Sequence, residues 1–426
     1  MSRNAVARGP AGAGERALAP DLARGFMLLF IALANTVWYL WTVPMGELGA
    51  HPAPESTLDS VTQFFTIMVV DGRSYPMFAF LFGYGMVQLA MRQEAAGASV
   101  KDVNALLRRR NLWLLAFGFF HALLLWFGDV LGAYGLAGLL LGWLFLRRKD
   151  TTLLVWASVF IGLLAALTAF SVVGMVLAPD GPSSGTGMDA MAASAAETSI
   201  LGAALGRVIV WPLITVVQGL VALVVPTMIL LAFWAARRRV LEEPGSHLPL
   251  LRWTAGLGIA IGWLGGLPNA LAQVGVWEPN PTQASMLAMP HMLAGLFGGL
   301  GYVALIALIA HAIQGRGREP GVVLTAITAT GKRSLSSYLA QSVLCAPILT
   351  AWGLGLAAYL TSWTMFLYAI GVWLITVVAA YLMERAGVRG PAEVLLRRLA
   401  YRHSTREPVP VGTVPPEGED QERATP

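Results

Sequence analysis

A histidine and an aspartate lie within one hydrophobic stretch, where side chains suited to proton transfer are costly to bury. His121 follows Arg110 by eleven residues, which is about 16 Å along a helix and near the middle of a bilayer. Asp129 comes two turns later, in a Gly-Asp turn. A buried neutral histidine can accept a proton at neutral pH. We expect His121 to act as a base and Asp129 to be a second catalytic candidate; helix-to-helix hydrogen bonding and helix capping are the structural alternatives.

A polar stripe begins the first hydrophobic stretch of the chain. Asp21 and Arg24 are three residues apart and share a helix face, and Asn35 follows on the same stripe. The stripe predicts one wall of a polar cavity, in which Asp21 would contact a substrate. An intrahelical ion pair and a helix-packing asparagine are the structural alternative.

A second polar group precedes the next hydrophobic stretch. Asp71 and Arg73 stand at its start, where we expect them to contact a substrate, and His51 and Asp59 lie in the segment upstream. A histidine in a loop is usually a solvated surface residue. Beside two carboxylates at the mouth of a membrane helix, His51 becomes a second candidate base.

The segment 331–342 begins another apolar stretch with an unusually polar turn. Lys332 and Arg333 precede it, and Gln341 lies further along among several hydroxyl side chains. This pattern favours either hydrogen bonds between helices or a vestibule for a charged ligand, in which Gln341 would contact substrate. A phosphate bound at the helix start is compatible with Gly331 and the two basic residues.

Several kinds of site are not indicated by the sequence. It has no Walker lysine motif, no dinucleotide fingerprint and no nucleophile-elbow spacing. His291 and His311 are roughly 30 Å apart on one predicted helix and cannot share a metal ion. Cys345 is the single cysteine, so neither a disulfide framework nor a thiolate cluster is expected. We predict no metal site.

The composition identifies the elements that must position these residues. Of 426 residues, 56% are hydrophobic and 12% are charged, about half the charged fraction of a soluble domain. The net charge of +5 reflects topology signals rather than nucleic-acid binding. We therefore predict an all-α integral membrane protein whose partner is the lipid bilayer. The Ala, Gly and Arg content is typical of a bacterium, which indicates the plasma (inner) membrane.

The apolar runs predict a bundle of about ten transmembrane helices. Basic residues concentrate in alternate connections, and the positive-inside rule then assigns both termini to the cytoplasm. The predicted spans are 22–43, 73–92, 111–128, 131–146, 152–177, 207–235, 251–274, 290–313, 334–354 and 363–384.

The polar ends of the chain are predicted to lie outside this bundle. Residues 1–18 and 403–426 have tail-like compositions and are expected to be disordered cytoplasmic segments. The membrane domain is expected over 19–402, with an N-terminal half 19–240 and a C-terminal half 241–402. In the outer segment 178–205, a short surface helix is expected near 188–204.

Five separated motifs carry a resemblance to a known family. They are "APDLARGFMLLFIALANT", "FAFLFGYGM", "FGFFHALLLWFGDVLGAYGLAGLLL", "GKRSLSSYLAQS" and "RGPAEVLLRRLAYR". In this order, over about residues 17–402, they resemble the YeiB-like family, whose C-terminal half is the domain of unknown function 418. That family is similar to the transmembrane acyltransferases, which include heparan glucosaminide acetyltransferase and bacterial sugar O-acyltransferases.

The resemblance implies an acyltransferase that uses cytoplasmic acyl-CoA, such as acetyl-CoA, as co-substrate, with no tightly bound cofactor. The acceptor would be a hydroxyl or amine of a sugar, lipid or metabolite, and a homodimer is conceivable because related enzymes form dimers. The YeiB-like pattern favours His121 and Asp129, whereas the glucosaminide acetyltransferase pattern offers His51, so two rival histidines remain. Asn35 would stabilise the developing oxyanion.

Five basic residues would meet the CoA phosphates in this reading, although ordinary topology charge also explains them: Arg24, Arg109, Arg110, Lys332 and Arg333. The main alternative function is a multi-pass transporter or flippase for a small or lipid-like substrate. It fits the number of spans and the Gly/Pro-rich helices, but the sequence shows no internal symmetry. A membrane scaffold without chemistry is a third option.

Overall fold

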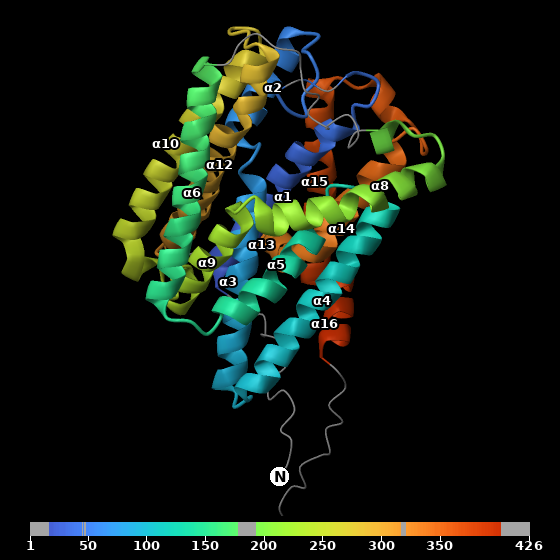
Figure 1. Ribbon diagram of the computed structural model, residues 1–426. Helices are drawn as coiled ribbons and strands as arrows, with labels where there is room; N and C mark the ends of the chain where they lie inside the picture. The colour runs from blue at the N-terminus through green and yellow to red at the C-terminus, as the bar shows by residue number, and fades with distance from the viewer. Residues whose placement is uncertain (1–16, 45, 47, 178–192, 317–320, 402–426) are drawn as a thin grey trace, which may run out of the picture.

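The computed structural model describes residues 17–44, 46, 48–177, 193–316 and 321–401, and within them every regular element is helical (Figure 1). This confirms the all-α class. Among the described residues, six helical segments are long and apolar enough to cross a membrane: Leu18–Tyr39, Asp150–Leu177, Ile200–Val221, Pro244–Gln273, Pro281–Gln314 and Ser362–Arg385. The protein is a helical membrane protein by these features.

The N-terminal half begins with α1 (Leu18–Thr36), η2 (Val37–Tyr39), α2 (Thr57–Val69), α3 (Ser74–Ala95), α4 (Val100–Leu124), α5 (Val130–Phe145) and α6 (Asp150–Leu177). It continues with α8 (Ile200–Val216), η3 (Val217–Val221) and α9 (Val224–Arg237). The C-terminal half contains η4 (Pro244–His247), α10 (Leu248–Gln273), α11 (Pro281–Met286), α12 (Ala288–Gln314), α13 (Val322–Lys332), α14 (Ser334–Leu349), η5 (Leu356–Tyr359), α15 (Ser362–Arg385) and α16 (Pro391–Ala400).

Helix α1 occupies the centre of the bundle. It contacts α3, α12, α13, α14 and α15, and its buried residues lie on all sides of the helix. Helices α6, α8 and α10 instead expose large apolar side chains, as the outer helices of a membrane bundle do. The polar stripe on α1 therefore faces other helices rather than lipid.

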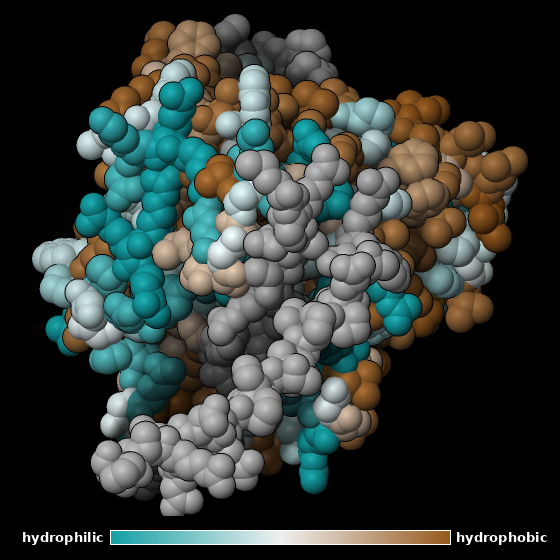
Figure 2. All heavy atoms as spheres, turned by 90° about the horizontal axis from the view of Figure 1, so that it is seen from below, coloured by the Kyte–Doolittle hydropathy of each residue, from teal (hydrophilic) through white to brown (hydrophobic). Residues whose placement is uncertain are grey.

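Hydrophilic side chains gather on one end of the molecule, the end that carries α16 and the α3–α4 turn (Figure 2). Apolar side chains surround this end at the flanks in the same view. Helix α2 lies at the opposite end (Figure 1). The end that carries α16 and the α3–α4 turn is therefore strongly polar.

One predicted span is divided in the structure. Residues 207–235 were expected to form a single helix, but α8 ends at Val216, a π-helical turn follows, and α9 begins only at Val224. Leu223 has a left-handed backbone with φ 60°, and Pro212 lies inside α8. These features interrupt the regular hydrogen-bond ladder that the apolar composition alone would support.

Four α-helices among the described residues were not predicted because they are short or polar. They are α2, α11, α13 and α16. The surface helix expected near 188–204 lies partly outside the described residues, and α8 begins at Ile200. The expected disordered tails also lie almost wholly outside the described residues.

Candidate functional site

The turn between α4 and α5 brings His121 and Asp129 together. Asp129 is the N-cap of α5, and its Oδ2 accepts a hydrogen bond of 2.7 Å from the Gly132 amide. Its Oδ1 lies 2.8 Å from His121 Nδ1. Both side chains are buried, with residue exposures of 3% and 0%. The two candidates, expected two helical turns apart, are therefore in contact, and the capping alternative is true of the same aspartate.

Ser342 of α14 completes a chain of three polar side chains. Its Oγ lies 2.8 Å from His121 Nε2, on the side of the ring away from Asp129. Because a carboxylate oxygen accepts the Nδ1 hydrogen, Nε2 is left as the acceptor for the serine hydroxyl. The result is an Asp–His–Ser sequence of hydrogen bonds, the arrangement by which proteins make a hydroxyl nucleophilic.

Neighbouring side chains fix the end of α4 that carries His121. The Arg207 guanidinium donates to the carbonyl oxygens of Ala122 and Leu123, at 2.9 Å each, and is itself buried. These carbonyls belong to the last turn of α4, which would otherwise lack hydrogen-bond donors. On the other side, the Tyr338 ring centroid is 5.1 Å from that of His121. The imidazole is thus held by groups from several helices.

A small cavity adjoins Ser342. Its volume is about 20 Å³, enough for one water molecule or one oxygen atom. Asn35, Gln341, Ser342 and Tyr338 are among its lining residues. The structure therefore brings Asn35, a predicted oxyanion donor, to the Ser342 side of the His121 cluster. Gln341 also binds the backbone of α1, because its Nε2 donates to the Leu28 carbonyl at 3.1 Å.

A large cavity of about 1090 Å³ lies at the polar end of the molecule. Its lining includes eight basic residues but only four acidic ones, so its walls carry an excess of positive charge. The basic residues are Arg24, Arg92, Arg110, Arg239, Lys332, Arg333, Arg389 and Arg397, and the acidic ones are Asp21, Glu242, Glu384 and Glu393. A concave, basic surface of this size suits a polyanion.

An aromatic layer separates the two cavities. Phe78 and Tyr134 line the large cavity and stack on each other with centroids 4.8 Å apart. The Tyr338 ring lies 6.4 Å from Phe78 and also lines the small cavity. Tyr338 therefore contacts both the wall of the large cavity and His121, and it lies between the basic chamber and the Asp–His–Ser cluster.

Four of the five predicted phosphate-binding residues line the large cavity, and their charges are not equally available. Glu384 accepts from Lys332 at 2.6 Å and from Arg333 at 2.7 Å. Arg110 makes no ion pair with the described residues, and its Nη1 is buried without a hydrogen-bond partner. It lies over the Phe82 ring at 5.3 Å. Of these four predicted residues, Arg110 is thus the cation most available to an anionic ligand.

Two more of the five predicted phosphate-binding residues, Arg24 on α1 and Arg109 on α4, differ in their position relative to the large cavity. Arg24 lines the large cavity and pairs with Asp21 at 3.0 Å, while also donating to the Leu81 carbonyl. The intrahelical ion pair, which was the structural alternative for these two residues, is therefore confirmed. Both residues of this pair line the large cavity. Arg109 is not among the lining residues, and its Nε donates to the Ala105 carbonyl of its own helix at 3.3 Å.

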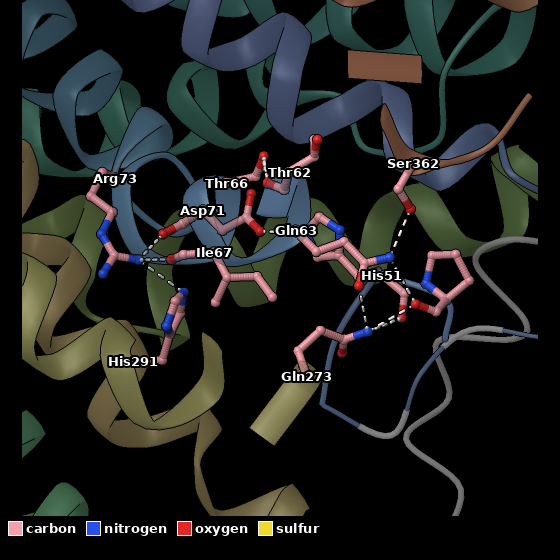
Figure 3. A network of polar contacts seen from close by, with 11 residues as sticks. His51, Thr62, Gln63, Thr66, Ile67, Asp71, Arg73, Gln273, His291 and Ser362 are labelled. Carbon is pink, nitrogen blue, oxygen red and sulfur yellow. Dashed lines mark hydrogen bonds and ion pairs between the residues drawn. The ribbon is translucent and has the colours of Figure 1, made fainter. Parts of the chain in front are cut away.

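His51 belongs to a separate cluster, at the α2 end of the molecule (Figure 3). Its Nε2 lies 2.7 Å from Asp71 Oδ2. Arg73 is fully buried and donates to the Ile67 carbonyl at 3.0 Å, to the Asp71 carbonyl, and to His291 Nε2 at 3.1 Å. The predicted grouping of His51, Asp71 and Arg73 is therefore present, with His291 as an additional member.

Asp59, which was expected near His51, has other hydrogen-bond partners. Its carboxylate instead accepts from the Ser56 hydroxyl at 2.8 Å and from the Trp363 amide at 2.9 Å. Burial by itself raises the pKa of Asp59, but the hydrogen bonds from Trp363 and Ser56 outweigh it and hold the pKa below its ordinary value. Asp59 is thus a structural link between the start of α2 and the start of α15.

Ser342 and Tyr338 were not selected from the sequence as functional residues. Both lie in the segment 331–342, and their spacing of four residues puts them on one face of α14. Cys345 extends the same face and is buried beside the small cavity. The available signal was therefore this polar helix face, but its partner on α4 is 221 residues away in the chain.

Comparisons with known proteins find two relatives that match the chain over more than nine-tenths of their length. Residues 235–403 match the family model described as protein of unknown function DUF418. The uncharacterized protein YxaH of Bacillus subtilis (strain 168) is 28% identical over 410 residues, covering 91% of this chain and 94% of the relative. The C-terminal part of the chain thus matches the DUF418 model, and nearly the whole chain is similar to YxaH, in agreement with the resemblance to the YeiB-like family.

Two further relatives show the same similarity. The uncharacterized protein YeiB of Escherichia coli (strain K12) is 26% identical over 412 residues, covering 91% of this chain and 97% of the relative. An uncharacterized 39.9 kDa protein encoded in the amylase 3′ region of Bacillus acidopullulyticus is 33% identical over 144 residues, covering 34% and 38% of the two chains. The names of these relatives assign no reaction, so the site itself has to indicate the function.

Proposed function

We propose that this YeiB-like protein is a membrane-embedded acyltransferase. It would take an acyl group from a cytoplasmic acyl-CoA and transfer it to a hydroxyl or amine of a sugar, lipid or metabolite. In this proposal the apolar helices cross the bacterial plasma membrane about ten times, and the polar end with both termini faces the cytoplasm. The orientation follows the positive-inside rule applied to the basic connections.

One observation carries the proposal: the buried Asp129–His121 pair lies one aromatic side chain away from a large basic cavity. The cavity offers cations to the CoA phosphates and has room for the nucleotide and pantetheine portions. Tyr338, which touches both His121 and the aromatic wall, marks the point where the thioester would approach the base. Acyl transfer needs a base at this position, because the attacking group must lose its proton.

His121 and Asp129 have distinct roles in this mechanism. His121 Nε2 accepts the proton of the attacking group and later returns it to the leaving group. Asp129 holds the imidazole through Nδ1 and stabilises its charged form. Asn35, on the wall of the small cavity, is placed to donate to the thioester oxygen as negative charge develops.

The test is release of free CoA by protein purified in lipid nanodiscs with a panel of acyl-CoA donors, with and without candidate acceptors. We expect His121→Ala to lower CoA release at least about 100-fold. His51→Ala should retain acceptor-independent CoA release, because His51 lies in the other cluster. Wild-type protein that is folded but neither binds nor consumes any acyl-CoA of the panel would remove the basis for the enzyme function.

A transporter remains a second candidate because of one specific feature, the interruption between α8 and α9. Discontinuous helices at membrane depth are typical of transporters, in which they form substrate sites. Proteoliposomes offer the test: uptake of a labelled sugar, peptide or lipid that is unaffected by acyl-CoA, and unaffected by His121→Ala, would favour transport over acyl transfer.

A further inference from the structure

We propose that Ser342 is the first acceptor of the acyl group, so that transfer passes through an acyl-serine enzyme. The inference rests on the proposed acyltransferase function and names a nucleophile within it. It follows from the two hydrogen-bond partners of His121. Its Nε2, the atom needed as base, is 2.8 Å from Ser342 Oγ, and its Nδ1 is 2.8 Å from Asp129.

The Ser342 hydroxyl bonds to a side chain of another helix and not to the backbone of its own helix. Several buried threonines return their hydroxyl to the carbonyl four residues earlier, as Thr330 does to Ala326 at 2.9 Å and Thr350 does to Ala346 at 2.6 Å. Ser342 is directed across the bundle to His121 instead. Its proton therefore has a base available within one hydrogen bond, which is the geometric requirement for an activated serine.

The surroundings of Ser342 provide for the other atoms of the reaction. The small cavity beside its hydroxyl holds one oxygen-sized group, and Asn35 is on the cavity wall. That position suits the thioester oxygen during attack. Tyr338 borders the same cavity and lies against Phe78 of the large cavity. An acyl-CoA held in the basic chamber would thus extend its acyl end past Tyr338 to Ser342.

The chemistry balances in two steps. Ser342 Oγ attacks the thioester carbon while its proton passes to His121 Nε2; the carbon–sulfur bond breaks, and the CoA thiolate takes that proton to leave as the thiol. The acceptor hydroxyl or amine then gives its proton to Nε2 and attacks the serine ester. The Oγ–carbon bond breaks, and Ser342 Oγ recovers the proton from His121. Nothing is oxidised or reduced.

The experiment detects the intermediate directly. Wild-type protein in nanodiscs is mixed with [1-¹⁴C]acetyl-CoA in the absence of acceptor, quenched in acid and digested for mass spectrometry. We expect a stoichiometric burst of free CoA and an acetyl group on the peptide that contains Ser342. Ser342→Ala should abolish the label and lower turnover at least about 100-fold. Ser342→Cys should form a thioester that neutral hydroxylamine cleaves.

Ser337→Ala is the matched control, because Ser337 is also a buried serine of α14 but is not among the residues lining either cavity. It should retain both label and turnover. CoA release at the wild-type rate from Ser342→Ala, or an acetyl group on another residue, would overturn the assignment while leaving the acyltransferase function in place.

A second probe tests Ser342 as the nucleophile even if the protein consumes no acyl-CoA. That lack of consumption would itself count against the proposed acyltransferase function. A small fluorophosphonate reacts with activated serines without any CoA. We expect it to modify Ser342 in wild-type protein and not in His121→Ala. Folded wild-type protein that acquires neither an acyl label nor a phosphonate at Ser342 would refute the nucleophile.

Discussion

Asp129 has two structural tasks that depend on different properties of its side chain. One oxygen caps α5 through the Gly132 amide, and the other faces His121. Capping needs an acceptor oxygen, which asparagine also has, whereas support of a protonated imidazole needs the negative charge. The two tasks can therefore be separated by substitution.

Asp129→Asn is expected to keep the fold and lose most of the activity. The amide oxygen can still cap α5, but the imidazole loses its anionic partner, so CoA release should fall by about 10²–10⁴-fold. Asp129→Ala should lose similar activity and also about 1–2 kcal/mol of stability, because the cap is gone. Activity assays and thermal midpoints of both variants check this. Equal stability of the two variants, or an active Asp129→Asn, would contradict the assigned roles.

At the residue scale, the sequence was informative about groups close in the chain. Both His121 and Asp129 were identified as candidates, but a continuous helix would separate them by about 12 Å. They meet because α4 ends at Leu124 and the chain turns back. The contact of His121 with Ser342 depends on how α14 packs on α4, which no local spacing encodes. For the same reason, the sequence could not choose between His121 and His51, which the structure assigns to different clusters.

At the scale of elements, α1 and α13 cross at two glycines. A β-carbon at Gly331 would collide with the Asp21 carbonyl, and one at Gly25 would collide with the Ile327 carbonyl. Both obstacles are backbone atoms, which cannot move aside as a flexible side chain can. This close crossing brings Asp21, Arg24 and Lys332 to the same wall of the large cavity.

Gly331→Ala should therefore separate the two helices. We expect a loss of stability of about 3 kcal/mol or more, at the upper end of overpacking effects, together with weaker CoA binding. Gly256→Ala is the control, since no heavy atom lies within 4 Å of the β-carbon it would add. It should be neutral or slightly stabilising through helix propensity. Thermal unfolding in one detergent compares the two, and an equally mild effect of both would refute the tight crossing.

Asp59 links α2 to α15 and makes their junction sensitive to pH. Its pKa in the folded protein lies below the ordinary value of 3.8, so its stabilisation is fully present above that value. It is lost as the pH falls through the lower, folded-state pKa. Asp59→Asn should cost about 1–2 kcal/mol at pH 7 and less below about pH 4. Thermal midpoints of both proteins from pH 3 to 7 test this; parallel curves would contradict it.

Apolar composition predicted most helices but not where a helix is interrupted. The run over 207–235 is almost entirely apolar after Arg207, yet it contains a π-helical turn and the left-handed Leu223. Those features depend on packing against neighbours: Gly219 lies where a β-carbon would meet the Ala133 carbonyl of α5. Short helices such as α13 were not predicted, because eleven residues with several threonines lack the length of a transmembrane span.

At the scale of the whole molecule, charge is arranged asymmetrically around one chamber. The large cavity lies at the end where hydrophilic side chains gather, and the Asp–His–Ser cluster lies beyond its aromatic wall (Figure 2). A charged donor would thus stay at the polar end while only its acyl group reaches the apolar interior. This division avoids moving phosphate charges into the membrane, which would be costly.

The availability of Arg110 within this chamber leads to a test of donor binding. Lys332 and Arg333 share Glu384, whereas Arg110 has no ion-pair partner among the described residues. Arg110→Gln should therefore weaken CoA binding about tenfold or more and make the remaining affinity less dependent on salt. Arg109→Gln removes the neighbouring charge outside the cavity lining and should change little. Calorimetric titration with CoA at two salt concentrations measures both. Similar losses from the two variants would mean that these arginines act through net charge alone, and that the cavity does not hold the donor.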